Sequence, residues 1–382
     1  MLGELVQNFE TVKLGVGSPD AVNVAILCLL GASALVSLKK SPSLGAAFLT
    51  PVQTDQIRGV AILLVIVGHF WFHVSQQKAL LILSGDAIAF FFLLSGFGLT
   101  MSVSAKPLSM RKFIVRRMQR VLIPYWCTTI LFLVLDAVLL GRTYPLPTIL
   151  LTLCGINMNE AATHLDYVRW YITVQLLWYI LFSVTMIQLR GKRALALLSA
   201  FATLIFFADY YITRQGWSQL FAFPAGCACG IYYKHLSTFY EQHKRRVRAA
   251  AGIAMLWVFF SKATLYPLAS ATLPQIVCKV ISEANGLLCA FGMCSLLIYL
   301  NRAGFVSRFL LWCGRYSYEL FLLHGPLLIK YNPVIRTTDT VPLVGQLAVF
   351  LCLLLAGAWL FHRLILLMRC IVAADTQTYR GT

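Results

Sequence analysis

Two ionisable residues, Arg58 and His69, lie eleven positions apart in an otherwise apolar stretch of the chain. In an α-helix, eleven residues return to nearly the same face and cover about 16 Å along the axis. Arg58 would then stand at the entrance of a polar wall, with His69 near the middle of the membrane. His73, four residues further on, would continue this wall as a secondary candidate. A neutral imidazole accepts a proton from a hydroxyl near neutral pH, so the spacing is typical of a general base inside an anion-binding channel.

The chemistry of such a wall suits an acyl thioester of coenzyme A. A guanidinium at the entrance can hold phosphate through bidentate, charge-assisted hydrogen bonds, while the pantetheine arm reaches inward to His69. Arg117 and Arg120 are three residues apart, share a helix face and add cations on the same predicted side. Each residue also has a structural interpretation: Arg58 as a snorkelling side chain, His69 as a hydrogen-bonded core residue, and the arginine pair as a cytoplasmic anchor.

Further polar residues interrupt the apolar segments and are candidates for supporting roles. Ser95 is expected at a depth close to that of His69, and Asp86 nearer the outer side, where it could orient a histidine or meet an acceptor hydroxyl. Ionisable groups at membrane depth face a cavity or pair with one another, so Glu319 and His324 are expected to pair with residues of other spans. The remaining supporting or acceptor-side candidates are two aromatic residues, Trp170 and Tyr125. Both would also fit an interfacial aromatic belt.

The elements that position these residues are membrane-spanning helices. Hydrophobic residues make up 59% of the 382 residues and charged residues 12%, about half of the roughly 25% in soluble domains. Lipid offers the backbone no hydrogen-bond partners, so spanning segments are helical. Eleven apolar segments have lengths near the ~20 residues of a span: 21–38, 59–76, 80–103, 121–141, 169–189, 194–213, 217–233, 249–268, 276–300, 309–330 and 343–363.

The basic residues predict how these helices are oriented. The net charge is +18, and Lys and Arg cluster between apolar segments, which favours a topological role over nucleic-acid binding. With the N-terminus outside, every strong cluster falls in the cytosol, as the positive-inside rule expects, and so does the C-terminus. This topology requires Leu146–Asn157 to be interfacial or re-entrant. We therefore predict an all-α polytopic bundle of about eleven transmembrane helices.

The chain divides into three predicted parts. Residues 1–50 form an N-terminal segment with one extra transmembrane helix, residues 51–370 form the membrane domain, and residues 371–382 form a short cytosolic tail. Most of the 11 cysteines lie inside apolar segments, where cysteine acts as a small hydrophobe, so they predict no metal site.

In their order along the chain, these residues resemble the membrane-bound acyltransferase-3 family of polytopic O-acyltransferases. The likeness extends from about Asp55 to Leu360, and the segment 21–38 is additional to the family's ten-helix core. It rests on Arg58 followed by His69, the segment 91–97 around Ser95, Arg117 and Arg120 before Pro124-Tyr125, Trp170-Tyr171, and Ser317-Tyr318 followed by His324.

This resemblance implies transfer of an acyl group, usually acetyl, from cytosolic acyl-CoA to a hydroxyl of an extracytoplasmic glycan or lipid-linked sugar. It implies that His69 is the general base and that Arg58, Arg117, Arg120 and Ser95 belong to the acyl-CoA site. Acetyl-CoA would be a cosubstrate, with glycan and membrane lipid as the other partners and with no metal and no nucleic acid. The protein would be a multi-pass protein of the bacterial inner (plasma) membrane.

Two other functions are compatible with buried polar residues in a membrane. Buried Asp, Glu and His also mark proton relays, so a secondary transporter or flippase for an anionic lipid or sugar is the alternative, although the sequence shows no matched halves of the kind that carriers use. His69, His73 and His324 could in principle ligate haem, but no surrounding pattern supports this.

Overall fold

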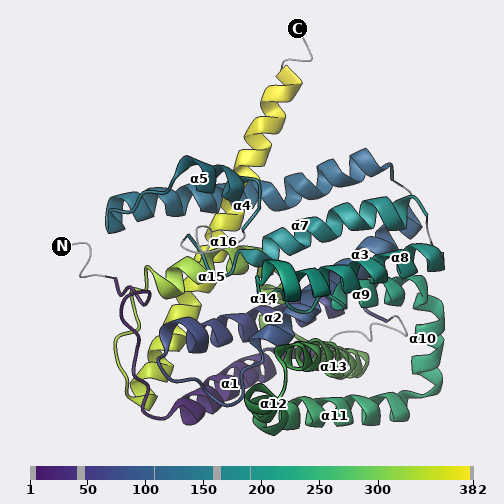
Figure 1. Cartoon of the computed structure of the whole chain (residues 1–382), viewed down its shortest axis with the longest axis horizontal. Coiled ribbons are helices and arrows are strands. Elements are labelled where there is room, and N and C mark those ends of the chain that lie inside the picture. The colour runs from purple at the N-terminus through teal and green to yellow at the C-terminus, as the bar shows by residue number, and fades with distance from the viewer. Residues whose placement is uncertain (1–5, 41–47, 107, 158–164, 190, 379–382) are drawn as a thin grey trace.

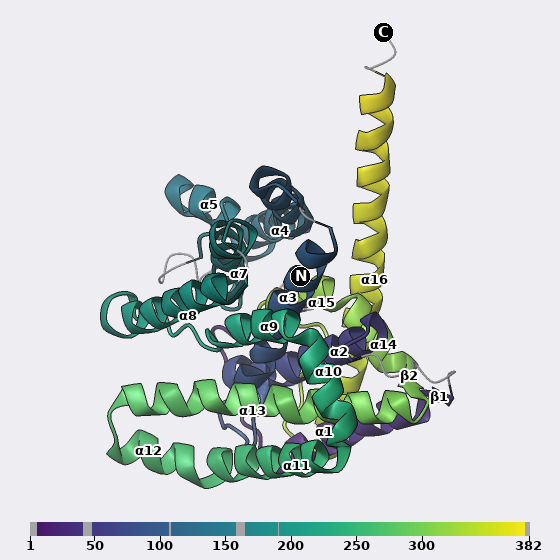
Figure 2. The ribbon, with the colours of Figure 1, turned by 90° about the vertical axis from the view of Figure 1, so that its right-hand side faces the viewer.

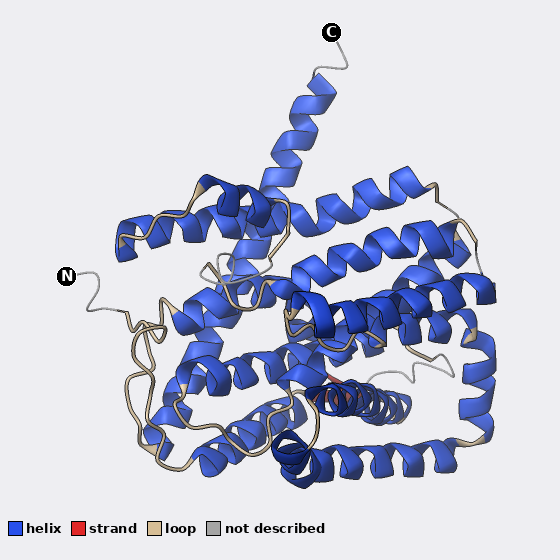
Figure 3. Cartoon of the chain, viewed as in Figure 1, coloured by secondary structure: helices blue, strands red, loops and turns tan. Residues whose placement is uncertain are grey.

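Helices make up nearly all of the regular structure (Figure 3). The computed structural model describes residues 6–40, 48–106, 108–157, 165–189 and 191–378, with side chains up to Met368. Within these ranges, nine helical stretches are long and apolar enough to cross a membrane. The all-α polytopic architecture predicted from the sequence is therefore confirmed.

Some of the nine stretches join an α-helix to a π-helical turn. The nine stretches are α1 (Pro19–Val36), α2 with η2 (Pro51–His69, Phe70–Val74), α3 (Ser84–Ala105), α4 (Met110–Leu140), α7 with η3 (Trp170–Phe182, Ser183–Ile187), α8 with η4 (Gly191–Ala208, Asp209–Thr213), α11 with η5 and α12 (Lys244–Phe260, Ser261–Leu265, Tyr266–Thr272), α13 (Gln275–Arg302) and α16 (Thr340–Thr378).

Two of the eleven predicted spans are not single long helices. The segment 217–233 contains only the ten-residue helix α9 (Ala222–Ile231), which is followed by α10 (Tyr233–Gln242). The segment 309–330 is divided at Tyr316 into α14 (Arg308–Arg315) and α15 (Ser317–Ile329). Apolar run length does not reveal such breaks, because they depend on what each half packs against.

Close backbone contacts explain where α14 lies. A Cβ built on Gly59 would lie 2.1 Å from the Leu310 carbonyl oxygen, and one on Gly314 would lie 1.7 Å from the Asp55 carbonyl oxygen. The first half of α2 and α14 therefore touch backbone to backbone at these two positions, which only glycine permits. The chain turns at Tyr316 and continues as α15, which also packs on α2.

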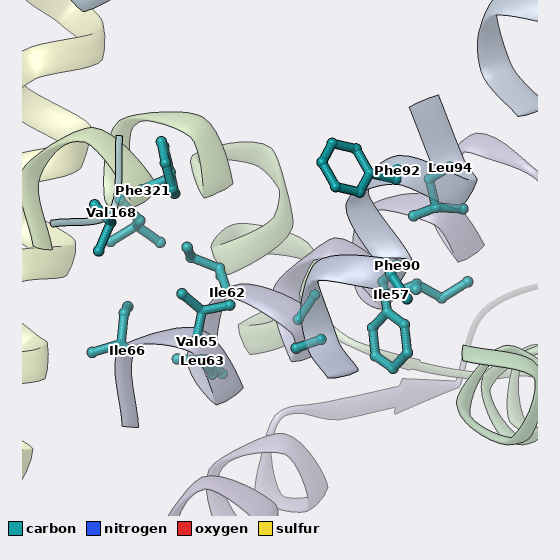
Figure 4. Packing of buried hydrophobic residues seen from close by; sticks show 14 of the residues in the cluster. Ile57, Ile62, Leu63, Val65, Ile66, Phe90, Phe92, Leu94, Val168 and Phe321 are labelled. Carbon is teal, nitrogen blue, oxygen red and sulfur yellow. The ribbon is translucent and has the colours of Figure 1, made fainter. Parts of the chain in front are cut away.

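Helices α2 and α3 form the centre of the bundle. Thr50 and Gln53 form a reciprocal capping box at the start of α2, with Pro51 in its first turn. The α2 stretch is 67% buried, whereas the stretches of α1, α8 and α11 are each 22% buried. Figure 4 shows part of the packing between α2 and α3, with Val168 and Phe321 nearby. Because lipid is as apolar as these side chains, close packing rather than water exclusion holds such helices together.

The shorter segments join the ends of the long helices. Strand β1 (Leu38–Lys40) pairs antiparallel with β2 (Phe305–Ser307) and so links the end of α1 to the start of α14. These two strands come from loops that the charge pattern assigned to the same side of the membrane. The helix α5 (Leu146–Leu153) has eight residues, too few to cross the bilayer, which agrees with the predicted non-crossing segment.

The two ends of the chain differ in how they pack. The segment before α1 lies across the C-terminal ends of η2 and α15: the Leu14 amide donates to the Val74 carbonyl at 2.9 Å, and the Phe9 amide to the Ile329 carbonyl at 2.7 Å. In contrast, α16 has 39 residues and projects beyond the other helices (Figures 1 and 2). The predicted tail from residue 371 continues this helix as far as Thr378.

Candidate active site

A cavity of about 1110 Å³ lies among α2, α3, α4, α7, α14, α15 and α16. Its volume exceeds the roughly 300–1,000 Å³ of most small-molecule sites, so it can hold a long ligand. The cavity brings together side chains that are up to 311 positions apart in the sequence, from Asp55 to Leu366. Seven of the predicted site residues line it: Arg58, His69, Ser95, Arg117, Arg120, Trp170 and Glu319.

One part of the cavity wall is strongly cationic. Arg58 comes from α2, Arg116, Arg117 and Arg120 from α4, and Arg315 from α14. The guanidinium of Arg117 also lies over the Phe113 ring, 5.7 Å from its centroid, which holds it against α4. The predicted arginine cluster is therefore real, and Arg116 and Arg315 join it.

Two acid–base pairs lie among these cations. Arg58 Nη1 is 2.9 Å from Asp55 Oδ1 one turn earlier in α2. Glu319 Oε1 is 2.7 Å from His362 Nδ1 of α16, and both side chains line the cavity. The predicted pairing of Glu319 with another span is confirmed. His362 was missed, because it stands beside Arg363 at the end of an apolar run and reads as part of a basic anchor.

His69 is the C-terminal residue of α2. It is about 27 Å from Pro51 along the axis and only about 8 Å from the end of η2, at about 1.5 Å per residue. His69 was expected near the middle of its span, but it lies closer to the C-terminal end of the helical stretch. The reason is that α2 begins at Pro51, whereas the predicted span begins at residue 59. Arg58 and His69 line the same cavity, as predicted.

His69 is hydrogen-bonded to His324 of α15, and the His324 side chain is fully buried. The distance between His69 Nδ1 and His324 Nε2 is 2.7 Å. The ring planes are nearly parallel, at 6°, and the centroids are 5.0 Å apart. Because the nitrogens are so much closer than the centroids, the rings meet edge to edge in one plane rather than face to face. The expected pairing of His324 with another span is confirmed.

His73 continues the row of rings on the far side of His69. Its ring centroid is 5.5 Å from that of His69 and 5.1 Å from that of Tyr167. Lys13 of the N-terminal segment donates a hydrogen bond to the His73 carbonyl oxygen. His73 does not line the cavity, so it lies behind His69 rather than on the wall facing the arginines.

Ser95 takes part in a hydrogen-bonded chain on the cavity wall. Tyr171 Oη donates to Gln175 Oε1 at 3.0 Å, and Gln175 Nε2 donates to Ser95 Oγ at 3.2 Å. All three residues line the cavity. Since Ser95 Oγ accepts from Gln175, its own hydroxyl hydrogen is left to donate to a ligand. Tyr171 and Gln175 follow Trp170 in α7, and the sequence had already grouped Tyr171 with Trp170 in the family motif.

The expected equal depth of Ser95 and His69 is wrong. A Cβ built on Gly68 would lie 2.1 Å from the Ser84 Cβ, so α3 begins beside the residue that precedes His69. Ser95 is eleven residues further along α3, or about 16 Å. Ser95 therefore lies towards the arginine end of the cavity, because the start of α3 is fixed by this close contact.

Asp86 and Tyr125 lie outside the cavity. Asp86 is fully buried, and its Oδ2 is 2.7 Å from Lys262 Nζ of η5, so the expectation that Asp86 orients a histidine is wrong. Tyr125 donates hydrogen bonds to the Thr152 carbonyl at 2.8 Å and to Asn157 Oδ1 at 3.1 Å. These hydrogen bonds link α4 to the segment around α5, and Tyr125 does not line the cavity.

A buried ion pair just before α7 supports Trp170 and was not predicted. Arg169 Nε is 3.2 Å from Asp166 Oδ2, and both side chains are 1% exposed. The Arg169 guanidinium also lies 5.0 Å from the centroid of the Tyr125 ring. These contacts fix the start of α7 and hence the direction in which Trp170 enters the cavity.

A family model described as an acyltransferase domain matches residues 53–363. The chain belongs to the acyltransferase-3 family. The matched region contains α3, α4, α7, α14 and α15 in full and parts of α2 and α16, and it leaves out α1. No curated protein and no solved structure matches the chain. With its nine candidate spans among the described residues, the acyltransferase-3 protein is a multi-pass membrane acyltransferase.

Proposed function

We propose that this acyltransferase moves an acyl group, most simply acetyl, from cytosolic acyl-CoA to a hydroxyl of an extracytoplasmic or lipid-linked glycan, with His69 as the general base. The observation that carries the proposal is that one cavity is lined both by the arginine cluster and by His69. The proposed site of action is the bacterial inner membrane, where such glycans are built.

The arginine cluster supports a donor with several phosphates. Arg58, Arg117, Arg120 and Arg315 all line the cavity, and guanidinium groups bind phosphate oxygens through paired hydrogen bonds. Arg58 and His69 are about 16 Å apart along α2. A donor whose phosphates and reactive carbonyl are joined by a flexible arm can therefore bind at one end and react at the other. The Ser95 hydroxyl lies on the wall that this arm would follow.

The proposed reaction needs one base and no metal. His69 accepts the proton of the acceptor hydroxyl, and the oxygen attacks the thioester carbonyl carbon. The new C–O bond forms, the C–S bond breaks, and the departing thiolate takes the proton back from His69. The free enzyme is restored with coenzyme A and an O-acyl ester as products. His69 lies near the end of α2 that is predicted to face outwards, where a glycan hydroxyl would arrive.

A complementation experiment tests the role of His69. Deletion cells would carry the wild-type chain, His69→Ala or His235→Ala, and their glycans would be analysed by mass spectrometry for the acetyl mass. His235 is an exposed residue of α10 and serves as the matched control. We expect His69→Ala to lose the modification, while the control keeps it and all three proteins insert equally. Acetylation by His69→Ala at the wild-type level would remove His69 as the base.

Binding measurements test the donor site separately. Isothermal titration of acetyl-CoA into purified protein should show weaker binding for Arg117→Ala and Arg120→Ala than for Arg111→Ala, an exposed arginine of α4 outside the cavity. Equal affinities in all three variants would contradict the donor site. Proton-coupled uptake of an anionic lipid or sugar by reconstituted protein, without acyl-CoA turnover, would replace the proposal by a carrier function.

A further inference from the structure

His324 has hydrogen-bond partners that determine which of its ring nitrogens carries the proton. Its Nδ1 is 2.8 Å from the Phe321 carbonyl oxygen and 3.1 Å from the Leu320 carbonyl oxygen. A carbonyl oxygen can only accept a hydrogen bond, so Nδ1 of His324 must be protonated and must donate. In the neutral ring, Nε2 of His324 then carries the lone pair.

This arrangement in turn fixes the tautomer of His69. His324 Nε2 faces His69 Nδ1 at 2.7 Å, and two lone pairs at that distance would repel each other. His69 Nδ1 must therefore be protonated and donate to His324. The remaining nitrogen of His69, Nε2, keeps its lone pair and makes no hydrogen bond to the described residues, while the side chain borders the cavity.

The opposite arrangement, with a charged His324 donating to His69, is disfavoured by burial. His324 is 0% exposed, and an imidazolium in such a place needs a counter-charge. Glu319, on the same helix, is hydrogen-bonded to His362, and Asp166 is paired with Arg169. Among the described residues, no carboxylate is hydrogen-bonded to His69 or to His324, so the neutral form of His324 is the stable one.

We infer that His324 is a positioning residue that holds His69 in the tautomer whose free Nε2 accepts the proton of the acceptor hydroxyl. This inference rests on the proposed function of His69. The proton does not continue to His324, because the other nitrogen of His324 already donates to its own helix. When His69 becomes positively charged, its Nδ1–H still donates to the lone pair of His324. His324 thus plays the orienting part that a carboxylate plays in a catalytic triad.

Two substitutions separate orientation from packing. His324→Gln can place an amide oxygen near the position of Nε2 and keep an acceptor for His69, whereas His324→Leu fills similar space without one. We expect His324→Leu to lower kcat about 100-fold and to leave the KM for acyl-CoA within about two-fold, because the arginine cluster is intact. His324→Gln should recover most of the lost kcat. Equal activity of His324→Leu and wild type would overturn the inference.

A spectroscopic measurement tests the tautomer without using the reaction. In protein labelled with ¹⁵N-histidine, the chemical shifts distinguish protonated from unprotonated ring nitrogens, and the His69 signals are those lost in His69→Gln. We expect a protonated Nδ1 and an unprotonated Nε2 at His69 in the wild-type protein. The reverse pattern would overturn the inference even if His324→Leu fails to fold. If His69→Ala retains full transfer activity, the proposed base is wrong, while the measured tautomer still reports on the histidine pair.

Discussion

Gly314→Ala tests whether α14 lies against α2 at the mouth of the cavity. The added Cβ would lie 1.7 Å from the Asp55 carbonyl oxygen, and ordinary contact begins at 3.4 Å. The two helices must therefore separate locally by about 1.7 Å. Because the contact is with backbone, no side-chain rotation can relieve it. Overpacking of this kind costs about 1–3 kcal/mol, and we expect the apparent melting temperature to fall by about 2 °C per kcal/mol.

The same separation should weaken donor binding. Arg315 follows Gly314 directly, and Arg58 lies one turn after Asp55, so both arginines move with the contact. The assays are thermal unfolding of detergent-purified protein and titration with acetyl-CoA. Gly345→Ala in α16 is the control, since a Cβ there meets nothing within 4 Å. Melting temperatures and affinities that are the same in both variants would refute the packing of α14 on α2.

Three further predictions concern single contacts. Lys330→Met removes the cation paired with buried Asp136 at 2.9 Å and should destabilise the protein by about 3–5 kcal/mol. Adding Asp136→Asn removes the unpaired charge but keeps an acceptor for Tyr144 and Tyr331, so it should restore part of the melting temperature. Gln175→Leu removes the donor to Ser95 and should weaken acetyl-CoA binding in a titration. If Ser95→Ala lowers the affinity equally, and the double variant lowers it no further, the two side chains act through one shared interaction. Phe9→Ala, at a side chain that is 3% exposed, should cost about 3 kcal/mol in thermal unfolding if the segment before α1 is docked.

The architecture followed from composition because a bilayer imposes simple rules. An apolar run of about 20 residues in lipid must form a helix, so nine of the eleven predicted spans correspond to long helices among the described residues. The two exceptions are α9, which is apolar but short, and the α14–α15 pair, and the lengths of these helices depend on their neighbours. Gly226 of α9 packs on the Leu93 carbonyl, and Gly314 of α14 packs on that of Asp55.

The residues of the site were visible in the sequence because ionisable groups in apolar runs are costly and therefore informative. Helix geometry alone placed Arg58 and His69 on one wall. It could not show that His69 is paired with His324, which lies 255 positions away. It also placed Ser95 at the wrong depth and gave Asp86 the wrong partner.

The sequence by itself determined the class of protein, the approximate helices and the family, because these depend on local composition and on motifs in order. The tertiary structure alone decided which polar side chains share a cavity and which nitrogen of His69 is free. Those properties depend on how α2, α7 and α15 pack against one another, and a shift of a few residues at the start of a helix moves a side chain by several ångströms.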